Sequence, residues 1–342
     1  MTQVLSEDEL LRNKQAILNR AITREEELVE AQSRRSKHYQ YIHPFAEAAE
    51  GVLEALINAD NRFKFGLLEI DTLTRGFGPK ELILVTGFSH AGKTQLINTA
   101  ILNNADKRVL FFSMDDPAEM ILLKLVCMHE EISAEELEKR VRRGDEAAIL
   151  MLRQAASRKY GNLFVVDESL GFRGMEQAIT EATDYWDAPP DCVIIDYLGS
   201  ISGDSDAEDG GIKKKVAELK RWIKDKPFPT IVVHQNTRSR GKPGEPIMIL
   251  SGAFGGEQES TILIGVRRKR DDENLDPAER FHHSDTITVH VVKNKRPPAK
   301  VTERDGIDFF MNPDTGMIRS QRPGERLLGG AIAREVGDDG LD

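Results

Sequence analysis

The sequence has few of the features that mark membrane, secreted or metal-cluster proteins. Its two cysteines, Cys127 and Cys192, lie in apolar runs without metal-ligand spacing, so we expect buried, reduced thiols. No apolar run approaches the roughly 20 residues that a membrane-spanning helix needs. The first residues, MTQVLSEDELL, carry acidic groups where a signal peptide carries basic ones. We therefore expect a cytoplasmic protein without a membrane partner.

Basic residues are also in deficit. The chain has 47 Lys and Arg against 57 Asp and Glu, which gives a net charge of −10. This balance argues against a protein that coats nucleic acid over its whole surface, but it is compatible with a local basic channel. The length of 342 residues allows one large core with an appended segment.

A phosphate-binding pattern is present in residues 85–94, VTGFSHAGKT. Its glycines allow backbone N–H groups to turn toward a phosphate, its lysine places a charge on the β- and γ-phosphates, and its threonine hydroxyl binds Mg²⁺. The pattern follows the β-prone run 81–86 and precedes the helical run 95–102, as a phosphate loop requires. We expect a nucleoside triphosphate and Mg²⁺ as cofactors, bound by Gly87, Phe88, Ser89, His90, Ala91, Gly92, Lys93, Thr94 and Gln95.

Three polar residues at strand ends are further candidates, because ligands gather at the carboxyl ends of strands in an open α/β sheet. Asp196 ends the run CVIID and is suited to hold Mg²⁺ through water, although strand-end aspartates also cap turns. Asp115 follows the strand 109–113 and is a candidate to orient the attacking water, with helix capping as the alternative. Gln235 ends the strand 229–234 and is a candidate contact for the γ-phosphate, whereas His234 is more simply a core histidine.

Two basic clusters follow strands. Arg267–Arg270 precedes three acidic residues, so we interpret it as the solvated end of a strand. Lys293, Lys295 and Arg296 precede Pro297, and we expect them to project across a subunit boundary onto a neighbour's γ-phosphate, as arginine fingers do.

Residues 65–318 alternate apolar strands with helical runs, which predicts an α/β fold with a mainly parallel sheet. We expect a helical N-terminal segment over 1–60, either solvated or docked on a neighbouring subunit, an ATPase domain over 61–320 and a disordered acidic tail over 321–342. Two internal stretches, 203–211 and 238–246, have mobile-loop compositions. The strand candidates are 81–86, 108–113, 162–166, 191–196, 229–234, 261–267 and 286–293.

Together these pieces resemble the RecA-fold ATPase domain of the DnaB-type replicative hexameric helicases, in a shortened version similar to those that phages encode. The resemblance covers about residues 60–318, and the order of its motifs is more specific than any one of them. The motifs are FGLLEIDTLTRG at 65–76, the phosphate loop, FSMD at 112–115, IDYL at 195–198, VHQ at 233–235, GAFGGEQ at 252–258 and KNK at 293–295.

The resemblance implies a RecA-like P-loop NTPase core that couples ATP hydrolysis to unwinding of single-stranded or forked DNA. It implies a hexameric ring or helical filament with ATP at each subunit interface, and a possible loader protein as partner. The implied roles are phosphate and Mg²⁺ binding for Lys93 and Thr94, Mg²⁺ binding for Asp196, a catalytic carboxylate at Asp115, a γ-phosphate sensor at Gln235, and trans-acting fingers at Lys293 with Lys295 or Arg296.

The sequence departs from the family pattern at several positions. Asp115 stands where the family has Glu, and Lys295 stands where it has Arg, which leaves two registers for the finger. The loops after Asp196 and Gln235 would line a DNA channel, but the first is acidic, so its phosphate contacts would come from backbone N–H groups or from Lys213, Lys214 and Lys215. The N-terminal segment is shorter than the family's usual primase-binding domain, so primase coupling is not expected.

Other functions fit parts of the same pattern. A RecA- or RadA-like recombination ATPase shares the fold, and KNKR is similar to the Lys-Asn-Arg motif of RadA proteins. A structure-specific nuclease on branched DNA would use acidic clusters to bind metal ions. A non-catalytic, ATP-switched loader or clamp is the remaining alternative.

Overall fold

The computed structural model of the chain describes Arg12, Glu27 and residues 14–24, 48–201, 208–236, 242–247 and 258–321. The chain divides into two units, Met1–Asn61 and Arg62–Asp342. In the first unit, residues 14–24 are helical and α2 spans Ala48–Ile57. The helical arm over 1–60 and the ATPase domain over 61–320 stay predictions. The described residues end at Gln321, so the rest of the predicted tail over 321–342 lies outside them.

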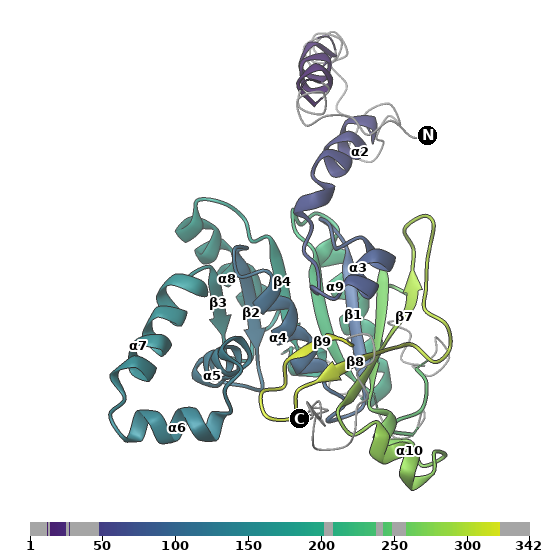
Figure 1. Cartoon of the computed structure of the whole chain (residues 1–342). Helices are drawn as coiled ribbons and strands as arrows, with labels where there is room; N and C mark the ends of the chain where they lie inside the picture. The colour runs from purple at the N-terminus through teal and green to yellow at the C-terminus, as the bar shows by residue number, and fades with distance from the viewer. Residues whose placement is uncertain are drawn as a thin grey trace, which may run out of the picture. The chain divides into compact units, whose positions relative to one another are not determined.

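The second unit is built around a single mixed sheet (Figure 1). Its strand order is β3-β2-β4-β5-β1-β6-β7-β8-β9, with parallel pairing from β3 to β6 and antiparallel pairing from β6 to β9. This confirms the prediction of an α/β fold with a mainly parallel sheet. The strands are β1 (Leu82–Gly87), β2 (Val109–Ser113), β3 (Leu163–Val166), β4 (Cys192–Asp196), β5 (Thr230–Gln235), β6 (Ile262–Arg267), β7 (Thr286–Asn294), β8 (Ile307–Met311) and β9 (Ile318–Ser320).

Helices cover the two faces of the parallel part of the sheet. Alternate residues of each strand face opposite sides, so Ile83 and Val85 of β1 join one hydrophobic cluster and Leu82 and Leu84 join the other. The first cluster includes residues of α4 and α5, and the second includes residues of α8 and α9. The helices of this unit are α3 (Leu68–Thr74), α4 (Lys93–Asn103), α5 (Ala118–Glu130), α6 (Ala134–Arg142), α7 (Glu146–Gln154), α8 (Phe172–Trp186), α9 (Glu208–Ile223) and α10 (Pro277–His282).

The burial of these strands explains their sequences. Every residue of β1, β2, β4 and β6 is buried. A parallel strand covered on both faces needs apolar side chains at consecutive positions instead of alternate ones. The two cysteines are also part of this buried core. Cys127 in α5 and Cys192 in β4 are free thiols, and burial raises the pKa of each.

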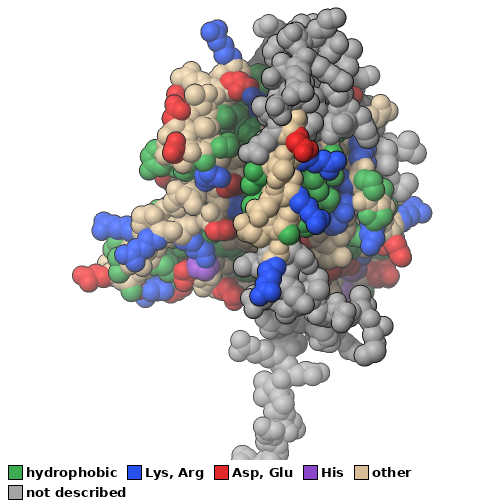
Figure 2. Space-filling view, turned by 90° about the horizontal axis from the view of Figure 1, so that it is seen from above, with side chains coloured by type: hydrophobic (Ala, Val, Ile, Leu, Met, Phe, Trp, Pro, Cys, Tyr) green, Lys and Arg blue, Asp and Glu red, His purple; other side chains and the backbone are tan. Residues whose placement is uncertain are grey.

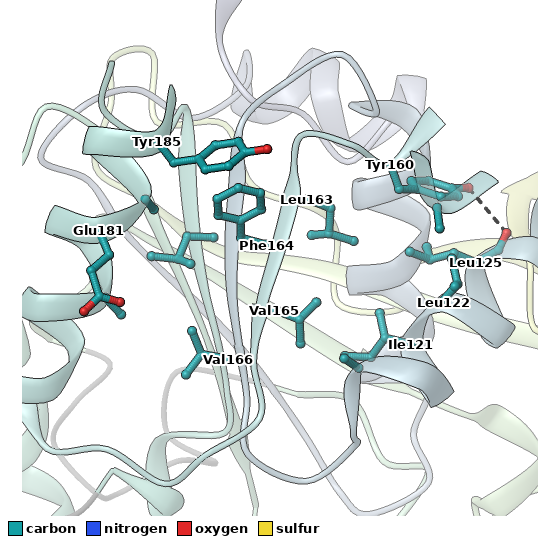
Figure 3. A pocket seen from close by; sticks show the side chains of 15 residues that line it. Ile121, Leu122, Leu125, Tyr160, Leu163, Phe164, Val165, Val166, Glu181 and Tyr185 are labelled. Carbon is teal, nitrogen blue, oxygen red and sulfur yellow. Dashed lines mark hydrogen bonds between the residues drawn. The ribbon is translucent and has the colours of Figure 1, made fainter. Parts of the chain in front are cut away.

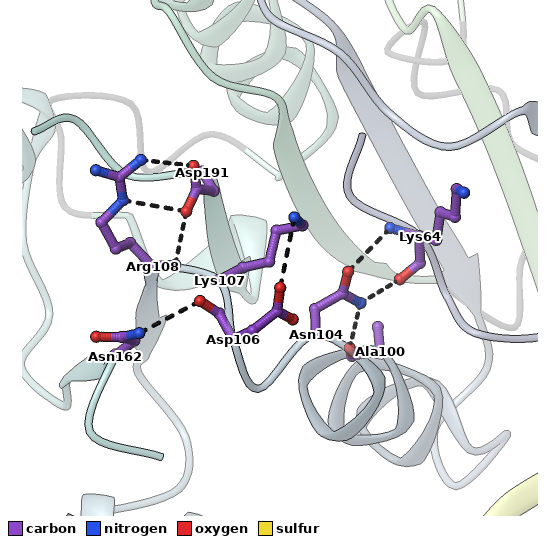
Figure 4. A network of polar contacts seen from close by, with 8 residues as sticks. All are labelled: Lys64, Ala100, Asn104, Asp106, Lys107, Arg108, Asn162 and Asp191. Atoms are coloured by element: carbon purple, nitrogen blue, oxygen red, sulfur yellow. Dashed lines mark hydrogen bonds and ion pairs between the residues drawn. The ribbon is translucent and has the colours of Figure 1, made fainter. Parts of the chain in front are cut away.

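A polar network fixes the edge of the sheet at which the parallel strands begin (Figure 4). Arg108, just before β2, donates from its backbone N–H, Nε and Nη2 to the Asp191 carboxylate at 2.8, 3.1 and 2.8 Å. Asp191 directly precedes β4, so this ion pair joins the starts of two neighbouring strands. Beside it, Asn104 bonds to both backbone groups of Lys64.

An apolar groove of about 560 Å³ runs along the outer strand β3 (Figure 3). It is lined by the side chains of β3 and by residues of α5 and α8, including Glu181 and Tyr185. Phe164 stacks on Trp186 at 4.3 Å between ring centroids, which fixes the wall of the groove on the α8 side. None of the predicted nucleotide residues lines this groove.

Charges of both signs are interspersed over the face seen in Figure 2. Surface ion pairs of α6 are of this mixed kind, for example Lys139 with Glu135 and Arg142 with Glu138. A charge pattern of this kind favours local contacts with an anionic partner over contacts across a whole face.

Candidate nucleotide site

The phosphate loop joins the end of β1 to the start of α4, and close contacts require both of its glycines. A Cβ placed on Gly87 would lie 2.3 Å from the backbone oxygen of Val266 on the neighbouring strand β6. Gly92 has a φ of 96°, and a Cβ there would lie 2.6 Å from Cδ1 of Ile287 in β7. Between them, His90 also adopts a positive φ of 60°. The loop therefore wraps tightly against β6 and β7.

The start of α4 offers backbone donors to an anion. Gly92 precedes the helix without a side-chain cap, and its carbonyl accepts the first helical hydrogen bond, from Leu96 N–H at 3.0 Å. The N–H groups in the first turn of a helix have no acceptor within the helix. Such an uncapped helix start fits a phosphate group.

Lys93 lies inside the loop. Its Nζ donates to the carbonyls of Gly87 at 3.1 Å and Phe88 at 2.7 Å, and the residue is 9% exposed. Burial lowers the pKa of Lys93 to about 8, against the opposing effect of the nearby Asp196. A polyanion in the loop would favour the charged ammonium, so the environment of this side chain fits nucleotide phosphates.

Thr94 and Asp196 meet at the carboxyl edge of the sheet. The Thr94 hydroxyl donates to Asp196 Oδ2 at 3.0 Å, and Asp196 is 8% exposed. Burial raises the pKa of Asp196, with Asp115 and Asp116 acting in the same direction, while Thr94 and Lys93 act to lower it. A hydroxyl beside a carboxylate is a donor set that fits Mg²⁺.

Asp115 and Asp116 follow β2 at the same edge. The backbone N–H of Met114 donates to the Asp196 carbonyl at 2.9 Å, which ties this segment to the end of β4. Asp116 pairs with Lys124 at 2.5 Å, whereas Asp115 is exposed. The role of Asp115 in orienting water stays a prediction.

Gln235 is placed next to the loop, because β5 pairs with β1 and its register sets Gln235 opposite Gly87. Its side chain is exposed, while His234 is buried. The sequence analysis did not single out Asn236, which accepts a hydrogen bond from Thr86 at 2.5 Å and donates from its backbone N–H to Gly87 O at 3.0 Å. A threonine within the apolar strand β1 was the available signal for this contact.

The prediction of a solvated Arg267–Arg270 cluster is wrong for its first two residues. Arg267 is 4% and Arg268 3% exposed, because strands β7 and β8 and the segment 242–247 enclose them. Arg268 Nη1 lies 3.6 Å from Met311 Sδ, and a Cβ placed on Gly92 would lie 3.8 Å from that same sulfur. Burial lowers the pKa of Arg268 to about 10. Met311 thus lies beside the phosphate loop and Arg268 contacts Met311, and the sequence alone did not identify either residue.

Lys293, Lys295 and Arg296 are at the opposite edge of the sheet. β7 runs antiparallel to β6, and its end at Asn294 pairs with Ile262, at the start of β6. The two edges are roughly 17 Å apart, since β1 covers six residues. Lys293 and Lys295 each donate from Nζ to the Gln258 carbonyl at 2.9 Å. Burial, with Lys295 beside it, lowers the pKa of Lys293 to about 8.

Arg296 differs from the two lysines in its contacts. Its Nε lies 2.9 Å from Glu81 Oε1, and its Nη2 donates to the Gly76 carbonyl. Burial lowers the pKa of Arg296, while the charge of Glu81 acts to raise it. Arg296 is therefore held by groups of its own chain.

Several predicted features lie wholly or partly outside the described residues. These are most of the acidic loop 203–211, the side chain of Lys213, the first four residues of the basic loop 238–246, and the GAFGGEQ motif except Gln258. Within the ranges that the structure describes, no three His, Cys, Asp or Glu side chains are grouped as metal ligands. No helix in those ranges is both long and apolar enough to cross a bilayer.

Comparison with known sequences identifies a family pattern. The profile of the DnaB-like helicase C terminal domain matches residues 63–303. Two curated relatives are a replicative DNA helicase DnaC of Bacillus subtilis (strain 168), 24% identical over 243 residues, and a replicative DNA helicase DnaB of Geobacillus stearothermophilus, 22% identical over 269 residues. The alignments cover 68% and 72% of this chain but 52% and 55% of those proteins, so the chain spans about half the length of these relatives.

Solved structures share the fold. One that is described as an ATPase domain matches with a TM-score of 0.67 at 18% identity, over 82% of this chain and 100% of that one. A DnaB-like replicative helicase, described together with its interactions with primase, matches with a TM-score of 0.65 at 17% identity, over 92% of this chain and 78% of that one. These similarities confirm the RecA-like core.

Proposed function

Because the chain belongs to the family of DnaB-like helicase C-terminal domains, we propose that it is an ATP-dependent DNA helicase that acts in DNA replication. The observation that carries this proposal is the convergence of Lys93, Thr94 and Asp196 at the carboxyl edge of the sheet. The relatives named as replicative helicases support the same reaction.

The loop residues have distinct tasks in ATP binding. The backbone N–H groups at the start of α4 and the Lys93 ammonium bind the phosphates, and the nine residues from Gly87 to Gln95 form the cradle. Thr94 and Asp196 hold Mg²⁺, which neutralises charge on the phosphates when bound. Since Asp196 is buried, it is protected from competing water and keeps one orientation.

Asp115 and Gln235 act on the γ-phosphate side. Asp115 is exposed beside Asp196, so its carboxylate is able to orient a water molecule and accept its proton. Gln235 lies opposite Gly87 of the phosphate loop in the pairing of β1 with β5. Its side chain contacts the γ-phosphate and transmits the loss of this phosphate to the connection between β5 and β6. Asp115 stands where the family has Glu, and its shorter side chain gives the catalytic carboxylate a shorter reach toward the water.

A neighbouring copy of the chain completes the site. Lys293 and Lys295 lie at the edge opposite their own phosphate loop, so they can act only on the nucleotide of another subunit. Lys295 is the finger in preference to Arg296, because Arg296 is held by Glu81 and Gly76. A head-to-tail contact of this kind builds a ring, such as a hexamer, or a helical filament around DNA.

The test is an end-labelled forked DNA incubated with protein, Mg²⁺ and ATP, and analysed on native and denaturing gels. The native protein and the Lys224→Ala variant, which changes an exposed lysine directly after α9, should release a full-length strand. Lys93→Ala should release none. Shortened strands would instead indicate a nuclease, and strand pairing without a fork requirement would indicate a recombination ATPase.

A further inference from the structure

The end of β6 contacts two different parts of the molecule. Arg267 is the last residue of β6, and Arg268 continues the extended backbone with φ −114° and ψ 111°. Successive side chains of an extended strand point to opposite sides. Arg268 reaches Met311 beside the phosphate loop, whereas Arg267 reaches the segment Lys242–Ile247. This segment belongs to the connection that follows Gln235.

Two contacts of Arg267 hold that segment. Its Nη1 donates to the Gly244 carbonyl at 2.8 Å, and its Nη2 donates to the Asp305 carbonyl at 3.1 Å. Asp272 Oδ2 lies 4.0 Å from Nη1 and supplies the opposite charge. The guanidinium thus joins the β5–β6 connection to the residues that precede β8.

The segment Lys242–Ile247 fits closely against the end of β6. Gly244 has a φ of 84°, and a Cβ there would lie 2.2 Å from the backbone nitrogen of Asp272. Ile247 is buried, and a Cβ placed on Gly265 in β6 would lie 2.8 Å from the Ile247 Cβ. Only glycine fits at positions 244 and 265, so this segment packs against β6 in a single arrangement.

Packing alone does not require a charged residue at position 267. A buried ion pair is on average no more stabilising than apolar side chains of the same volume. The fixed fork of an arginine does, however, hold two backbone carbonyls in one arrangement. This specificity is what a connection between two functional segments requires.

We propose that Arg267 is a positioning residue that ties the segment Lys242–Ile247 to the nucleotide edge of the sheet, so that DNA bound near this segment stimulates ATP hydrolysis. The inference rests on the proposed function. Lys242, whose side chain is 60% exposed, pairs with Glu273 Oε2 at 3.3 Å. A DNA phosphate that replaces Glu273 as the partner of Lys242 shifts this segment, and the shift passes through Gly244 and Arg267 to β6, and from there to the phosphate loop that β6 contacts at Gly87.

The experiment compares ATP hydrolysis with and without a single-stranded oligonucleotide in the full-length protein. Arg267→Met keeps the bulk of the side chain but removes its donors, and Gly244→Ala moves the segment while Arg267 stays in place. Arg270→Met is the matched control, because this arginine of the same cluster is 46% exposed. We expect both test variants to lose about tenfold in the ratio of stimulated to basal rate, with basal rates within about twofold of the native protein. Arg267→Lys should recover part of the ratio.

The outcomes separate this inference from the proposed function. A native protein that hydrolyses ATP but does not respond to DNA contradicts both. A native protein that responds to DNA, together with test variants that keep the native ratio, contradicts the inference alone. Equal losses of basal and stimulated rates in both test variants, with lowered melting temperatures, would show that Arg267 serves only stability, and this also overturns the inference.

Discussion

The Thr94 hydroxyl donates a 3.0 Å hydrogen bond to Asp196 Oδ2, although the two residues are 102 positions apart in the chain. The bond joins the first turn of α4 to the end of β4, on two elements whose places are fixed by the buried sheet. With Lys93 adjacent, these residues bring an ammonium, a hydroxyl and a carboxylate to one point at the helix start. The fold itself therefore brings these three groups together.

Replacement of Asp196 by Asn should strongly lower ATP hydrolysis without a loss of stability. Burial raises the folded-state pKa of Asp196 above its ordinary value of 3.8, so ionisation destabilises the folded state as pH rises through this window. A neutral amide of the same shape avoids this cost but is a poor Mg²⁺ ligand. We expect hydrolysis to fall by about two orders of magnitude and the melting temperature at neutral pH to stay equal or rise. Native turnover in Asp196→Asn would exclude this residue from the site.

ATP binding should take up a proton in mildly alkaline solution. The pKa of Lys93 is about 8 in the free protein, so above that pH its amine is largely neutral. Bound phosphates favour the ammonium and raise this pKa. Affinity should therefore fall by up to about tenfold per pH unit above the free-protein value and level off below it. Calorimetry in two buffers of different ionisation enthalpy measures the proton directly, and binding without proton uptake at about pH 9 would contradict this environment for Lys93.

The Arg108–Asp191 pair should make stability depend on pH in the acidic range. Burial acts to raise the pKa of Asp191, but the hydrogen bonds and charge of Arg108 outweigh it and hold the pKa below 3.8. A lowered carboxylate pKa contributes stability above the unfolded-state value, and this contribution is lost as pH falls through the folded-state value. Because both side chains are about one-third exposed, solvent screening limits the loss in Asp191→Asn to about 1 kcal/mol at neutral pH. Denaturant unfolding should show this difference shrink as pH falls below the ordinary pKa of 3.8, and a constant difference would contradict it.

Replacement of Arg296 should lower stability, whereas replacement of Lys295 should abolish ATP hydrolysis. Arg296→Lys removes the paired contacts to Glu81 and Gly76 and should lower the unfolding free energy by about 1–3 kcal/mol. Lys295→Met should leave the melting temperature close to native while hydrolysis is lost, since its contact to Gln258 O is exposed. Thermal melting and ATPase rates on the same samples decide between them. Loss of hydrolysis in Arg296→Lys at native stability would assign the finger to Arg296.

Apolar patterning was sufficient to find the strands that build the core. The predicted strands at 81–86, 108–113 and 191–196 are present as β1, β2 and β4, shifted by about one residue at their ends. These segments are buried on both faces, so the sequence shows them as unbroken apolar runs. β8 and β9 were not predicted, because Asp308 interrupts the apolar run of β8 and β9 has only three residues.

The site was predictable where its chemistry follows a fixed spacing in the chain. The loop residues and Asp196 were identified from the sequence, but their roles stay predictions. Asn236, Arg268 and Met311 were not found, because their contacts depend on the register of strands that are far apart in sequence. The burial of Arg267 and Arg268 was likewise hidden, since a run of four basic residues looks like a solvated strand end until the segment that covers it is placed.

The most direct test of the shared site combines two inactive variants. Lys93→Ala lacks a working phosphate loop and Lys295→Met lacks the finger, so neither should hydrolyse ATP or unwind a fork alone. When the two chains carry different tags and are co-expressed and purified through both, some interfaces pair the intact loop of one chain with the intact finger of the other. The account predicts that these mixed oligomers recover ATP hydrolysis to about a quarter of the native rate, as random mixing at a head-to-tail interface requires. Mixed oligomers that form but stay inactive would contradict a nucleotide site completed by a neighbouring subunit.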